Sequence, residues 1–471
     1  MESKVISKRG YVVRKSFLES KDINKIKKEL TMTPFTLPGF QQEPKRFKLY
    51  QENEHKLYLP KAYGLQRFGK PDINKLENSG DDIQLEFLGS MRENQIPVIE
   101  TFISACQKQG GGLICLGCGF GKTIISLKIV SLLKKKTLIV VHKEFLLNQW
   151  LERINEFLPE ARVGRIQQNK VDIIDKDIVI AMLQSISMKD YPKDTFDSFG
   201  FVALDECHHL GAEVFSKALP KITSKYMLGL TATPYRKDGM KKVFENYLGN
   251  IVYCIRGREP EKVLVKLINY HCQDIKYCQE QFNFKGQINS PKMINQLSED
   301  PVRLQLVIQQ IKISILENRK ILILSDRRNH LSDCKEAIDK LGICSTGYYV
   351  GGSKPETLKE SEEKDVILGT YSMASEGMDI PLLNTVILAT PKSDIEQSVG
   401  RILRQKKEHR VVDPLIIDII DQTSNFKRQS LHRKRHYKKS NYIIEQIDYP
   451  QKPSKELADQ NVLLKFNDCL L

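Results

Sequence analysis

The middle of the chain carries short apolar runs separated by segments whose apolar residues recur at helical spacing. Between residues 86 and 255 these runs are GLICL (112–116), TLIVV (137–141), DIVIA (177–181) and FVALD (201–205). Runs of this length, bounded by turns and helices, are typical of parallel strands that a sheet buries on both faces. The pattern predicts an α/β domain over residues 86–255.

The same pattern returns after residue 256 and continues to about residue 450. Its apolar runs are VLVKLI (263–268), KILILS (320–325), DVILGT (365–370), NTVILAT (384–390) and PLIIDII (414–420). A chain of 471 residues is also too long for one core, since a domain takes roughly 150 residues. We therefore expect an α/β fold with two parallel-sheet domains in series, the second over residues 256–450.

The two ends of the chain have a different texture. In residues 1–85, the pieces FKLYQ (47–51) and KLYLP (56–60) flank the polar turn ENEH, which predicts a hairpin. The stretch KPDINKLENSGDD (70–82) is rich in turn-forming residues and resembles a linker. We expect residues 1–85 to form a small accessory module and residues 451–471 to form a polar tail.

Apolar runs long enough to cross a membrane are absent from the sequence, because none approaches the roughly 18 residues that a span requires. The N-terminal sequence MESKVISKRGYVVRKSFL alternates charged and apolar residues and lacks the apolar core of a signal peptide. We therefore expect a soluble intracellular protein of the nucleus or the cytoplasm, with no membrane partner.

The chain has a net charge of +15, and its positive charge is concentrated in two segments. Residues 1–70 hold 16 Lys and Arg against 7 Asp and Glu, and residues 427–439 hold seven Lys and Arg with no acid. Such blocks can be ordinary solvated surface. Interleaved aromatic residues instead favour a surface that follows a phosphate backbone; here they are Tyr11, Phe17, Phe47, Tyr50 and Tyr437.

A phosphate-binding loop is indicated where the run GLICL ends. The segment from Leu116 to Thr123 follows an apolar run and opens a helical pattern, so backbone N–H groups and the positive helix end would face a phosphate. Gly119 and Gly121 permit the tight backbone, Lys122 would reach the β- and γ-phosphates, and Thr123 would bind Mg²⁺. Leu116 stands where the full motif begins with glycine, so the match is to its shorter core. An ordinary glycine turn is the alternative.

The cysteines Cys115 and Cys118 overlap this loop and have the C-x-x-C spacing of some zinc sites. No second pair and no suitably spaced Cys/His cluster accompanies them. The phosphate loop explains their position better, so we predict no structural metal.

Two acids end a later apolar run, in the sequence FVAL-Asp205-Glu206. Carboxylates at the carboxyl end of a parallel strand lie beside the ligand crevice of an open α/β sheet. Asp205 would hold Mg²⁺, and Glu206 would orient or deprotonate the attacking water. The adjacent His208 and His209 could suggest a metal site, but further ligands are lacking nearby. With Lys122, these acids predict an ATP-hydrolysing site.

The second half supplies arginines that a simple nucleotide hydrolase would not need. Arg401 and Arg404 are three residues apart in a helical pattern, and Gln397 lies one turn before Arg401. Planar guanidinium groups suit the charge that develops on a transferred γ-phosphoryl group. A charged surface helix is the alternative, but Glu396 to Gly400 supplies no salt-bridge partner at four-residue spacing. We expect ATP to bind between the two domains, with Arg401 and Arg404 drawn onto its γ-phosphate.

These motifs, in this order, resemble those of superfamily 2 helicases over residues 86 to 450, and the resemblance implies RecA-like domains. Asp205-Glu206-Cys207-His208 is similar to the family's DExH motif, and Thr231-Ala232-Thr233 to the motif that links hydrolysis to movement. The resemblance implies adenine recognition by Arg92 and Gln95, and places Gly377 and Asp379 near the ribose and the domain interface. Implied nucleic-acid contacts, to sugar and phosphate, are His142, Lys143, Gln184, Ser185, Arg327 and Thr370.

Within the superfamily, the segments LGLTATPYRKDG, YSMASEGMDIP and YLPKAYGLQRFGKP look most like the XPB-related branch of DNA repair and transcription. They are similar in particular to helicases of large DNA viruses and phages, and a viral origin would add the virion to the expected locations. Arg236-Lys237-Asp238 stands where that branch has Arg-Glu-Asp. The resemblance implies an ATP-dependent DNA helicase or duplex translocase whose N-terminal module engages nucleic acid.

Three other functions fit parts of the same pattern. An RNA helicase would use the same motor, since backbone contacts do not distinguish the sugar unless a 2′-OH is bound. A transcript-release or binding factor would keep the fold, and a decayed ATPase would lack Lys122, Glu206 or Arg404. The motor subunit of a restriction nuclease would need a carboxylate–lysine nuclease cluster, and the short flanks leave little room for one.

Overall fold

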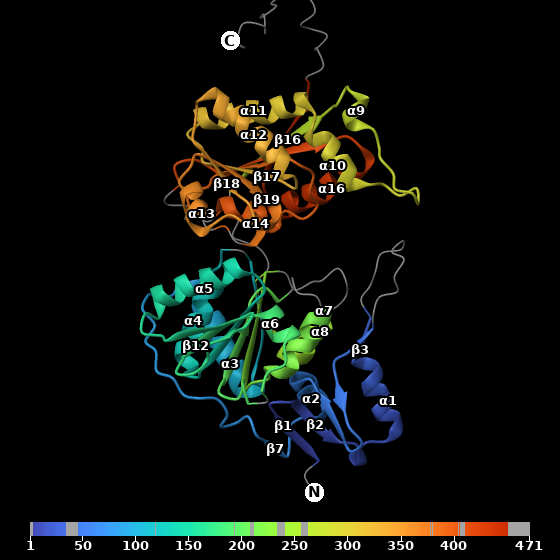
Figure 1. Cartoon of the computed structure of the whole chain (residues 1–471), viewed down its shortest axis with the longest axis vertical. Coiled ribbons are helices and arrows are strands. Elements are labelled where there is room, and N and C mark those ends of the chain that lie inside the picture. Colours follow the sequence, from blue (N-terminus) through green and yellow to red (C-terminus); the bar gives the residue numbers. More distant parts are fainter. Residues whose placement is uncertain are drawn as a thin grey trace, which may run out of the picture. The chain divides into compact units, whose positions relative to one another are not determined.

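The computed structural model describes residues 3–33, 46–117, 119–192, 194–207, 212–232, 241–255, 262–376, 378, 380–403, 405 and 410–450. The chain divides into two compact units, Met1–Gly257 and Arg258–Leu471, each of which is described by itself (Figure 1).

Unit 1 is built on an eight-stranded sheet in the order β11-β10-β12-β9-β13-β14-β8-β15, in which only the edge strand β11 is antiparallel among the described pairs. The strands are β8 (Gly111–Leu116), β9 (Thr137–Val141), β10 (Val163–Gln167), β11 (Lys170–Val171), β12 (Ile178–Met182), β13 (Phe201–Leu204), β14 (Tyr226–Thr231) and β15 (Ile251–Ile255). The four apolar runs predicted as strands are β8, β9, β12 and β13, and their parallel pairing confirms the predicted class.

Side chains alternate between the two faces of this sheet, as a pleated strand requires. Helices α3 (Ile96–Gln109), α4 (Lys122–Leu133) and α5 (Glu144–Phe157) supply Phe102, Leu127 and Trp150 to the core on one face. On the opposite face lie α6 (Leu183–Met188), α8 (Lys241–Leu248) and the N-terminal residues, which share a second core. Helix α7 (Ala212–Ala218) comes after β13 in the chain and contacts α6. Helices α3, α4 and α5 therefore all pack on one face of the sheet. Helices α4 and α5 begin at its carboxyl edge.

The N-terminal residues form a sheet of their own in the order β5-β6-β2-β1-β7. The strands are β1 (Lys4–Ser7), β2 (Gly10–Arg14), β5 (Gln51–Glu52), β6 (Lys56–Leu59) and β7 (Ile73–Asn74), with α1 (Ser20–Glu29) and α2 (Lys61–Phe68) as helices. The predicted hairpin forms between β5 and β6, whereas β4 (Phe47–Lys48) pairs with β3 (Thr31–Met32) instead.

This N-terminal sheet packs directly against the α/β part of unit 1. Lys61 is buried, and its ammonium donates hydrogen bonds to the carbonyl oxygens of Ser224 at 2.8 Å and Lys225 at 2.9 Å. The hydroxyl of Tyr247, on α8, donates to the carbonyl of Leu49 at 3.0 Å. A continuous apolar core joins the two parts, so they are held together by burial as well as by these contacts.

Unit 2 is a seven-stranded sheet in the order β18-β19-β17-β20-β21-β16-β22, and every described pair is parallel. The strands are β16 (Leu264–Tyr270), β17 (Ile321–Ser325), β18 (Thr346–Tyr349), β19 (Val366–Thr370), β20 (Thr385–Leu388), β21 (Leu415–Asp421) and β22 (Ile443–Tyr449). The five apolar runs of the second half are β16, β17, β19, β20 and β21, which confirms the predicted second parallel sheet.

Helices cover both faces of this sheet, as its two cores show. Helices α11 (Pro301–Leu316) and α12 (Arg328–Leu341) pack on one face. Helices α14 (Tyr371–Glu376), α15 (Glu396–Val399) and α16 (Ser424–Lys439) pack on the other. The remaining described α-helices of the unit are α9 (Ile275–Cys278), α10 (Ser290–Ser298) and α13 (Pro355–Glu362).

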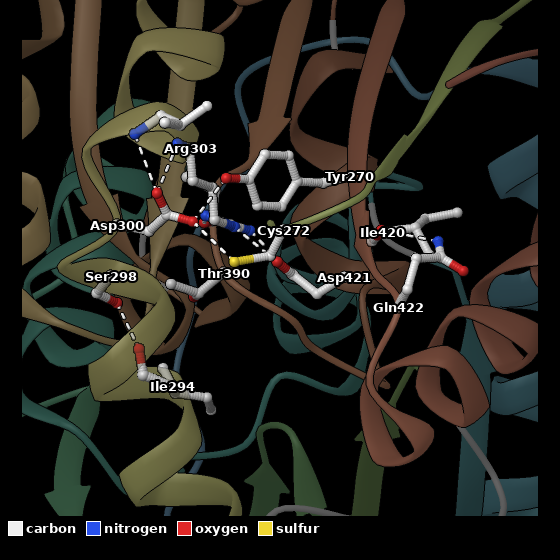
Figure 2. A network of polar contacts seen from close by, with 12 residues as sticks. Tyr270, Cys272, Ile294, Ser298, Asp300, Arg303, Thr390, Ile420, Asp421 and Gln422 are labelled. Carbon is white, nitrogen blue, oxygen red and sulfur yellow. Dashed lines mark hydrogen bonds and ion pairs between the residues drawn. The ribbon is translucent and has the colours of Figure 1, made fainter. Parts of the chain in front are cut away.

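Buried polar side chains connect the helices of unit 2 to its strands. Arg303 on α11 is fully buried and binds Asp421, at the end of β21, through Nε at 2.8 Å and Nη2 at 3.0 Å (Figure 2). The hydroxyl of Tyr270, at the end of β16, donates to Asp300 at 2.6 Å. On the other face, Arg433 of α16 binds Asp418 at 2.8 and 2.9 Å. Each charge is therefore buried with a partner of matching geometry.

Candidate functional site

The motif residues of unit 1 lie at one edge of its sheet. The phosphate loop follows β8, Asp205 and Glu206 follow β13, and His142 follows β9. Because these strands are parallel, their carboxyl ends meet at the same edge, where ligands bind in open α/β sheets. Strand order separates β13 from β8 by β14 alone, which brings the loop and the two acids together.

The loop after β8 has the backbone that phosphate binding requires. Gly119 and Gly121 have φ angles of 79° and 90°, in the left-handed region that glycine adopts without strain. Gly121 is the N-cap of α4, whose first residues are Lys122 and Thr123. A side chain on Gly121 would also come within 2.5 Å of the Gln95 amide nitrogen, so the loop fits glycine there on two grounds. The backbone and the helix start fit a phosphate group.

Lys122 and Glu206 form an ion pair in which Nζ lies 2.6 Å from Oε1, and both side chains are largely buried. The predicted phosphate-binding lysine and the predicted base are thus brought together. Glu206 also has a φ of 45°, which is uncommon for a residue with a side chain. Strained backbone of this kind persists where the surrounding structure enforces it and concentrates at active sites.

Asp205 is buried, and both of its carboxylate oxygens accept hydrogen bonds. The indole N–H of Trp150 donates to Oδ2 at 2.8 Å, and the backbone N–H of Glu206 donates to Oδ1 at 2.9 Å. Burial, followed by repulsion from Glu206, raises the pKa of Asp205 to about 6, against the lowering effect of Lys122. A buried carboxylate held in this way favours a nearby positive charge, and Mg²⁺ prefers oxygen ligands such as those of Asp205 and Thr123.

Gln95 contacts the phosphate loop itself. Its side-chain amide donates to the carbonyl of Phe120 at 2.8 Å and accepts from the backbone N–H of Arg92 at 3.0 Å. Gln95 is buried, whereas Arg92 is exposed at the start of a 3₁₀ turn (Glu93–Gln95). The predicted adenine-recognition pair therefore lies beside the loop, with Gln95 supporting its backbone.

The predicted nucleic-acid contacts of unit 1 lie at the starts of two helices. His142 and Lys143 precede α5, and the amide of Gln184 on α6 donates to the His142 carbonyl at 2.9 Å. Ser185 is buried, and its hydroxyl accepts from the backbone N–H of Gln168 at 2.9 Å. Lys143 and Gln184 have the surface positions that a ligand can reach, while Ser185 has a structural partner.

In unit 2, Arg401 is buried and bound to backbone. Its Nε donates to the carbonyl of Ala374 at 2.5 Å and its Nη1 to the carbonyl of Met378 at 2.7 Å. Gln397 lies on α15, and Arg401 follows on a 3₁₀ turn (Gly400–Leu403) rather than on a continuous α-helix. The predicted residues Arg404, Gly377 and Asp379 lie outside the described residues, as do Thr233, His208 and Arg236-Lys237-Asp238.

Arg327 and Thr370 lie at the carboxyl ends of β17 and β19, which are neighbours in the sheet. The Arg327 guanidinium binds the side chain of Asn295 and, at 2.9 Å, the carbonyl of Pro291. It therefore attaches α10 to the end of β17. The Thr370 hydroxyl lies 3.3 Å from that of Ser372.

A cavity of about 360 Å³ opens beside the Arg303 network of unit 2, among α9, α10 and the ends of β16 and β21. Its lining includes Cys272, Cys278, Met293 and Phe426, and none of the predicted site residues. It is separate from the edge positions of Arg327 and Thr370.

Trp150 was not predicted as a site residue, and the prediction of a surface position is wrong for Arg433 and Tyr437 of the basic block 427–439. Trp150 is the only tryptophan of the chain and occupies the buried stripe of α5, so spacing alone marks it as core. Arg433 and Tyr437 are buried on α16, and Tyr11 and Tyr50 are buried in unit 1, so they are not part of a phosphate-following surface. Six of the seven basic residues of 427–439 remain outside the core.

Comparison with known proteins gives related sequences over almost the whole chain. A family model described as "Type III restriction enzyme, res subunit" matches residues 88–236. "Putative ATP-dependent RNA helicase L396" of Acanthamoeba polyphaga mimivirus is 37% identical over 452 residues, which cover 93% of this chain and 86% of the relative. "Putative ATP-dependent RNA helicase QP509L" of an African swine fever virus isolate (Tick/Malawi/Lil 20-1/1983) is 27% identical, covering 93% of this chain and 92% of the relative.

Among solved structures, "The fragment structure of a putative HsdR subunit of a type I restriction enzyme from Vibrio vulnificus YJ016" matches with a TM-score of 0.55. The match covers 77% of this chain and 69% of that one, at 18% identity, and it concerns the fold alone.

The chain belongs to the helicases of superfamily 2. It is an ATP-hydrolysing enzyme that acts on nucleic acid. In the part of the chain that the structure describes, every helix is too short or too polar to cross a membrane.

Proposed function

We propose that this helicase moves along DNA, driven by Mg²⁺-dependent ATP hydrolysis at Lys122, Asp205 and Glu206, in DNA repair or transcription. The observation that carries the site assignment is the 2.6 Å contact between Lys122 and Glu206, beside the buried Asp205. Lysine, acid and glycine loop are the set that phosphoryl transfer uses.

Each residue has a role that its position supports. Lys122 binds the β- and γ-phosphates, exchanging its contact with Glu206 for phosphate oxygens. Glu206, once released, accepts a hydrogen bond from the attacking water and orients it. Asp205 and Thr123 would hold the metal, which would supply positive charge against the phosphates of the nucleotide. Gln95 keeps the loop backbone in place while Arg92 is exposed beside it.

For unit 2 we propose one catalytic and one positioning arginine. Arg404 stabilises charge on the transferred phosphoryl group, as motif resemblance implies. Arg401 holds the segment from Ala374 to Met378 through two backbone carbonyls, and to bind phosphate it would have to give up those contacts. Gln397, Gly377 and Asp379 keep the nucleotide-linked roles that the resemblance implies.

The chain engages nucleic acid in our proposal through backbone contacts in both units. In unit 1 these are His142, Lys143, Gln184 and Ser185, together with the basic residues 1–85; in unit 2 they are Arg327 and Thr370. Helix α16 adds an outward basic face, since Lys427, Arg428, Arg435, Lys438 and Lys439 are all exposed. In this proposal, residues 86–255 and 256–450 are the two RecA-like domains of the motor.

DNA is proposed as the substrate because the segments LGLTATPYRKDG and YSMASEGMDIP resemble the DNA-repair and transcription branch. RNA is the second candidate, and the names of two relatives favour it. The test is ATP hydrolysis by the full chain with single-stranded DNA, duplex DNA and RNA of one sequence, together with strand displacement. We expect the largest stimulation with DNA. Greater stimulation by RNA would overturn the DNA assignment and leave the motor in place.

A further inference from the structure

Helix α5 connects two parts of unit 1 that the proposed function uses separately. It begins at Glu144, directly after His142 and Lys143. Its buried stripe consists of Leu146, Leu147, Trp150 and Ile154, which pack on the sheet. Within that stripe only Trp150 carries a side-chain hydrogen-bond donor.

The indole N–H of Trp150 donates to Asp205 Oδ2 at 2.8 Å, and both side chains are buried. The other oxygen accepts from the backbone of Glu206. Two donors from different directions fix the orientation of the carboxylate, because rotation about the side chain would break at least one of them. The Asp205 backbone is fixed as well, since its N–H donates to the carbonyl of Val140 on β9 at 3.0 Å.

Ordinary core packing accounts for the burial of Trp150 but leaves its partner unexplained. A buried indole N–H needs an acceptor, and a backbone carbonyl would satisfy it. Here the acceptor is instead the carboxylate that ends β13. Partners that hold a metal-binding carboxylate orient it for the metal, and their removal typically costs 10–100-fold in metal affinity or activity.

We propose that Trp150 is a positioning residue that orients the Asp205 carboxylate for the metal, and that α5 carries changes at His142 and Lys143 to that carboxylate. The inference rests on the proposed function, which assigns the metal to Asp205 and nucleic acid to the start of α5. Nucleic acid that binds at Lys143 would shift α5 and thereby move the indole donor.

The first test compares Trp150→Phe with Asp205→Asn and Ile154→Val in the full chain. Phenylalanine keeps an aromatic ring in the core and removes the donor, whereas Ile154→Val removes a methyl group from the same stripe without touching Asp205. The measurement is the anisotropy of a fluorescent ADP analogue as a function of Mg²⁺ concentration, with thermal unfolding recorded for each variant. Because it reports binding, it does not depend on turnover.

We expect Trp150→Phe to raise the Mg²⁺ concentration required for half-maximal binding by about tenfold. Binding of ADP without Mg²⁺ should match wild type, since the loop from Gly119 to Lys122 is untouched. A Mg²⁺ requirement unchanged from wild type, with thermal unfolding shifted as in Ile154→Val, would show Trp150 to be core alone. If Asp205→Asn also left the requirement unchanged, the metal role of Asp205 in the proposed function would fail instead.

The second test uses Trp150 as the sole intrinsic tryptophan probe of the chain. We expect its emission to change when a DNA oligonucleotide binds in the absence of nucleotide, and Lys143→Ala to reduce that change. Anisotropy of a labelled oligonucleotide confirms binding independently. Bound oligonucleotide with unchanged emission would overturn the link through α5, while absence of binding would count against the proposed nucleic-acid contacts.

Discussion

The two units bury charge in different ways. In unit 1, Lys122 and Glu206 meet at a strand edge with exposed fractions of 12% and 15%, beside Asp205. In unit 2, the exposed fractions are 0% for Arg303 and 8% for its partner Asp421. They are 1% for Arg433 and 0% for its partner Asp418. Each arginine binds its partner through two hydrogen bonds. One arrangement keeps a charge at an edge that a ligand can reach, and the other closes it inside the fold.

The residue types match this difference. A lysine ammonium is a point charge on a flexible stem, so Lys122 can exchange a carboxylate for a phosphate. A guanidinium is a planar fork that satisfies both oxygens of a carboxylate at once, so Arg303 binds the end of β21 and Arg433 binds its middle. We infer that unit 1 places its buried charge for chemistry and that unit 2 places it for rigidity.

The largest effect is expected from Lys122→Ala. Without the ammonium, nothing at this position balances the γ-phosphate charge, and nucleic-acid-stimulated ATP hydrolysis should fall by about 10³-fold or more. The measurement is steady-state phosphate release with saturating DNA. Lys217→Ala, an exposed lysine on α7, is the matched control and should keep wild-type turnover. Substantial turnover by Lys122→Ala would remove this residue from the site.

Arg303→Met tests the claim that buried charge in unit 2 serves rigidity. The variant leaves Asp421 buried without its guanidinium, and breaking such a pair costs about 3–5 kcal/mol of unfolding free energy. Urea unfolding of the wild type and the variant measures this loss. The control is Lys340→Met, whose pair with Glu336 is exposed and should contribute less than about 1 kcal/mol. Equal small effects of both substitutions would contradict the proposed rigid role of Arg303.

Stability should depend on pH through His330, which is buried on α12. Burial, followed by repulsion from Arg303, lowers the pKa of His330 from 6.5 to about 3. Between these values the unfolded chain binds a proton that the folded chain does not, so stability falls as pH drops from about 6.5 towards 3. From pH 7 to pH 5 the loss from this group is about 2 kcal/mol.

Urea unfolding of wild type and His330→Leu at pH 7 and pH 5 measures this contribution. The variant should lose less stability than the wild type over the same interval, whatever its stability at pH 7. An identical pH dependence in the two proteins would show that His330 does not contribute.

The smallest effect concerns the exterior of unit 2. Replacing Arg435 and Lys439 by Gln removes two exposed charges of α16 and should reduce the slope of log affinity against log salt by about 1 to 2. The measurement is DNA binding by anisotropy over a salt series. Lys340→Gln, on another helix, should leave the slope unchanged. A double variant with the wild-type slope would exclude the outward face of α16 from the contact.

The fold was accessible from sequence because buried parallel strands leave uninterrupted apolar runs, and the predicted runs in both units are strands. The placement of the candidate site residues in unit 1 was accessible for a related reason: parallel strands place Lys122, Asp205 and His142 at one edge. The contact between Trp150 and Asp205 was not, since spacing along α5 identifies a buried position and says nothing of its hydrogen-bond partner.

The basic block 427–439 shows a second limit. Counting charges treated Arg433 and Tyr437 as surface, yet Phe426, Ser430, Arg433 and Tyr437 recur at helical spacing and form the inner face of α16. That periodicity is present in the sequence, but the charged residue Arg433 within it makes the buried face hard to recognise. The role of Arg401 depended on the carbonyl groups of a distant segment, which no local pattern encodes.

The central claim is that unit 1 holds the nucleotide through Lys122 while Glu206 acts on the attacking water. Single-turnover hydrolysis by Glu206→Gln, with saturating DNA and with ATP binding measured on the same sample, tests it most directly. The account predicts ATP affinity close to that of the wild type and hydrolysis slower by about 10²–10⁴-fold. Hydrolysis at the wild-type rate would contradict it.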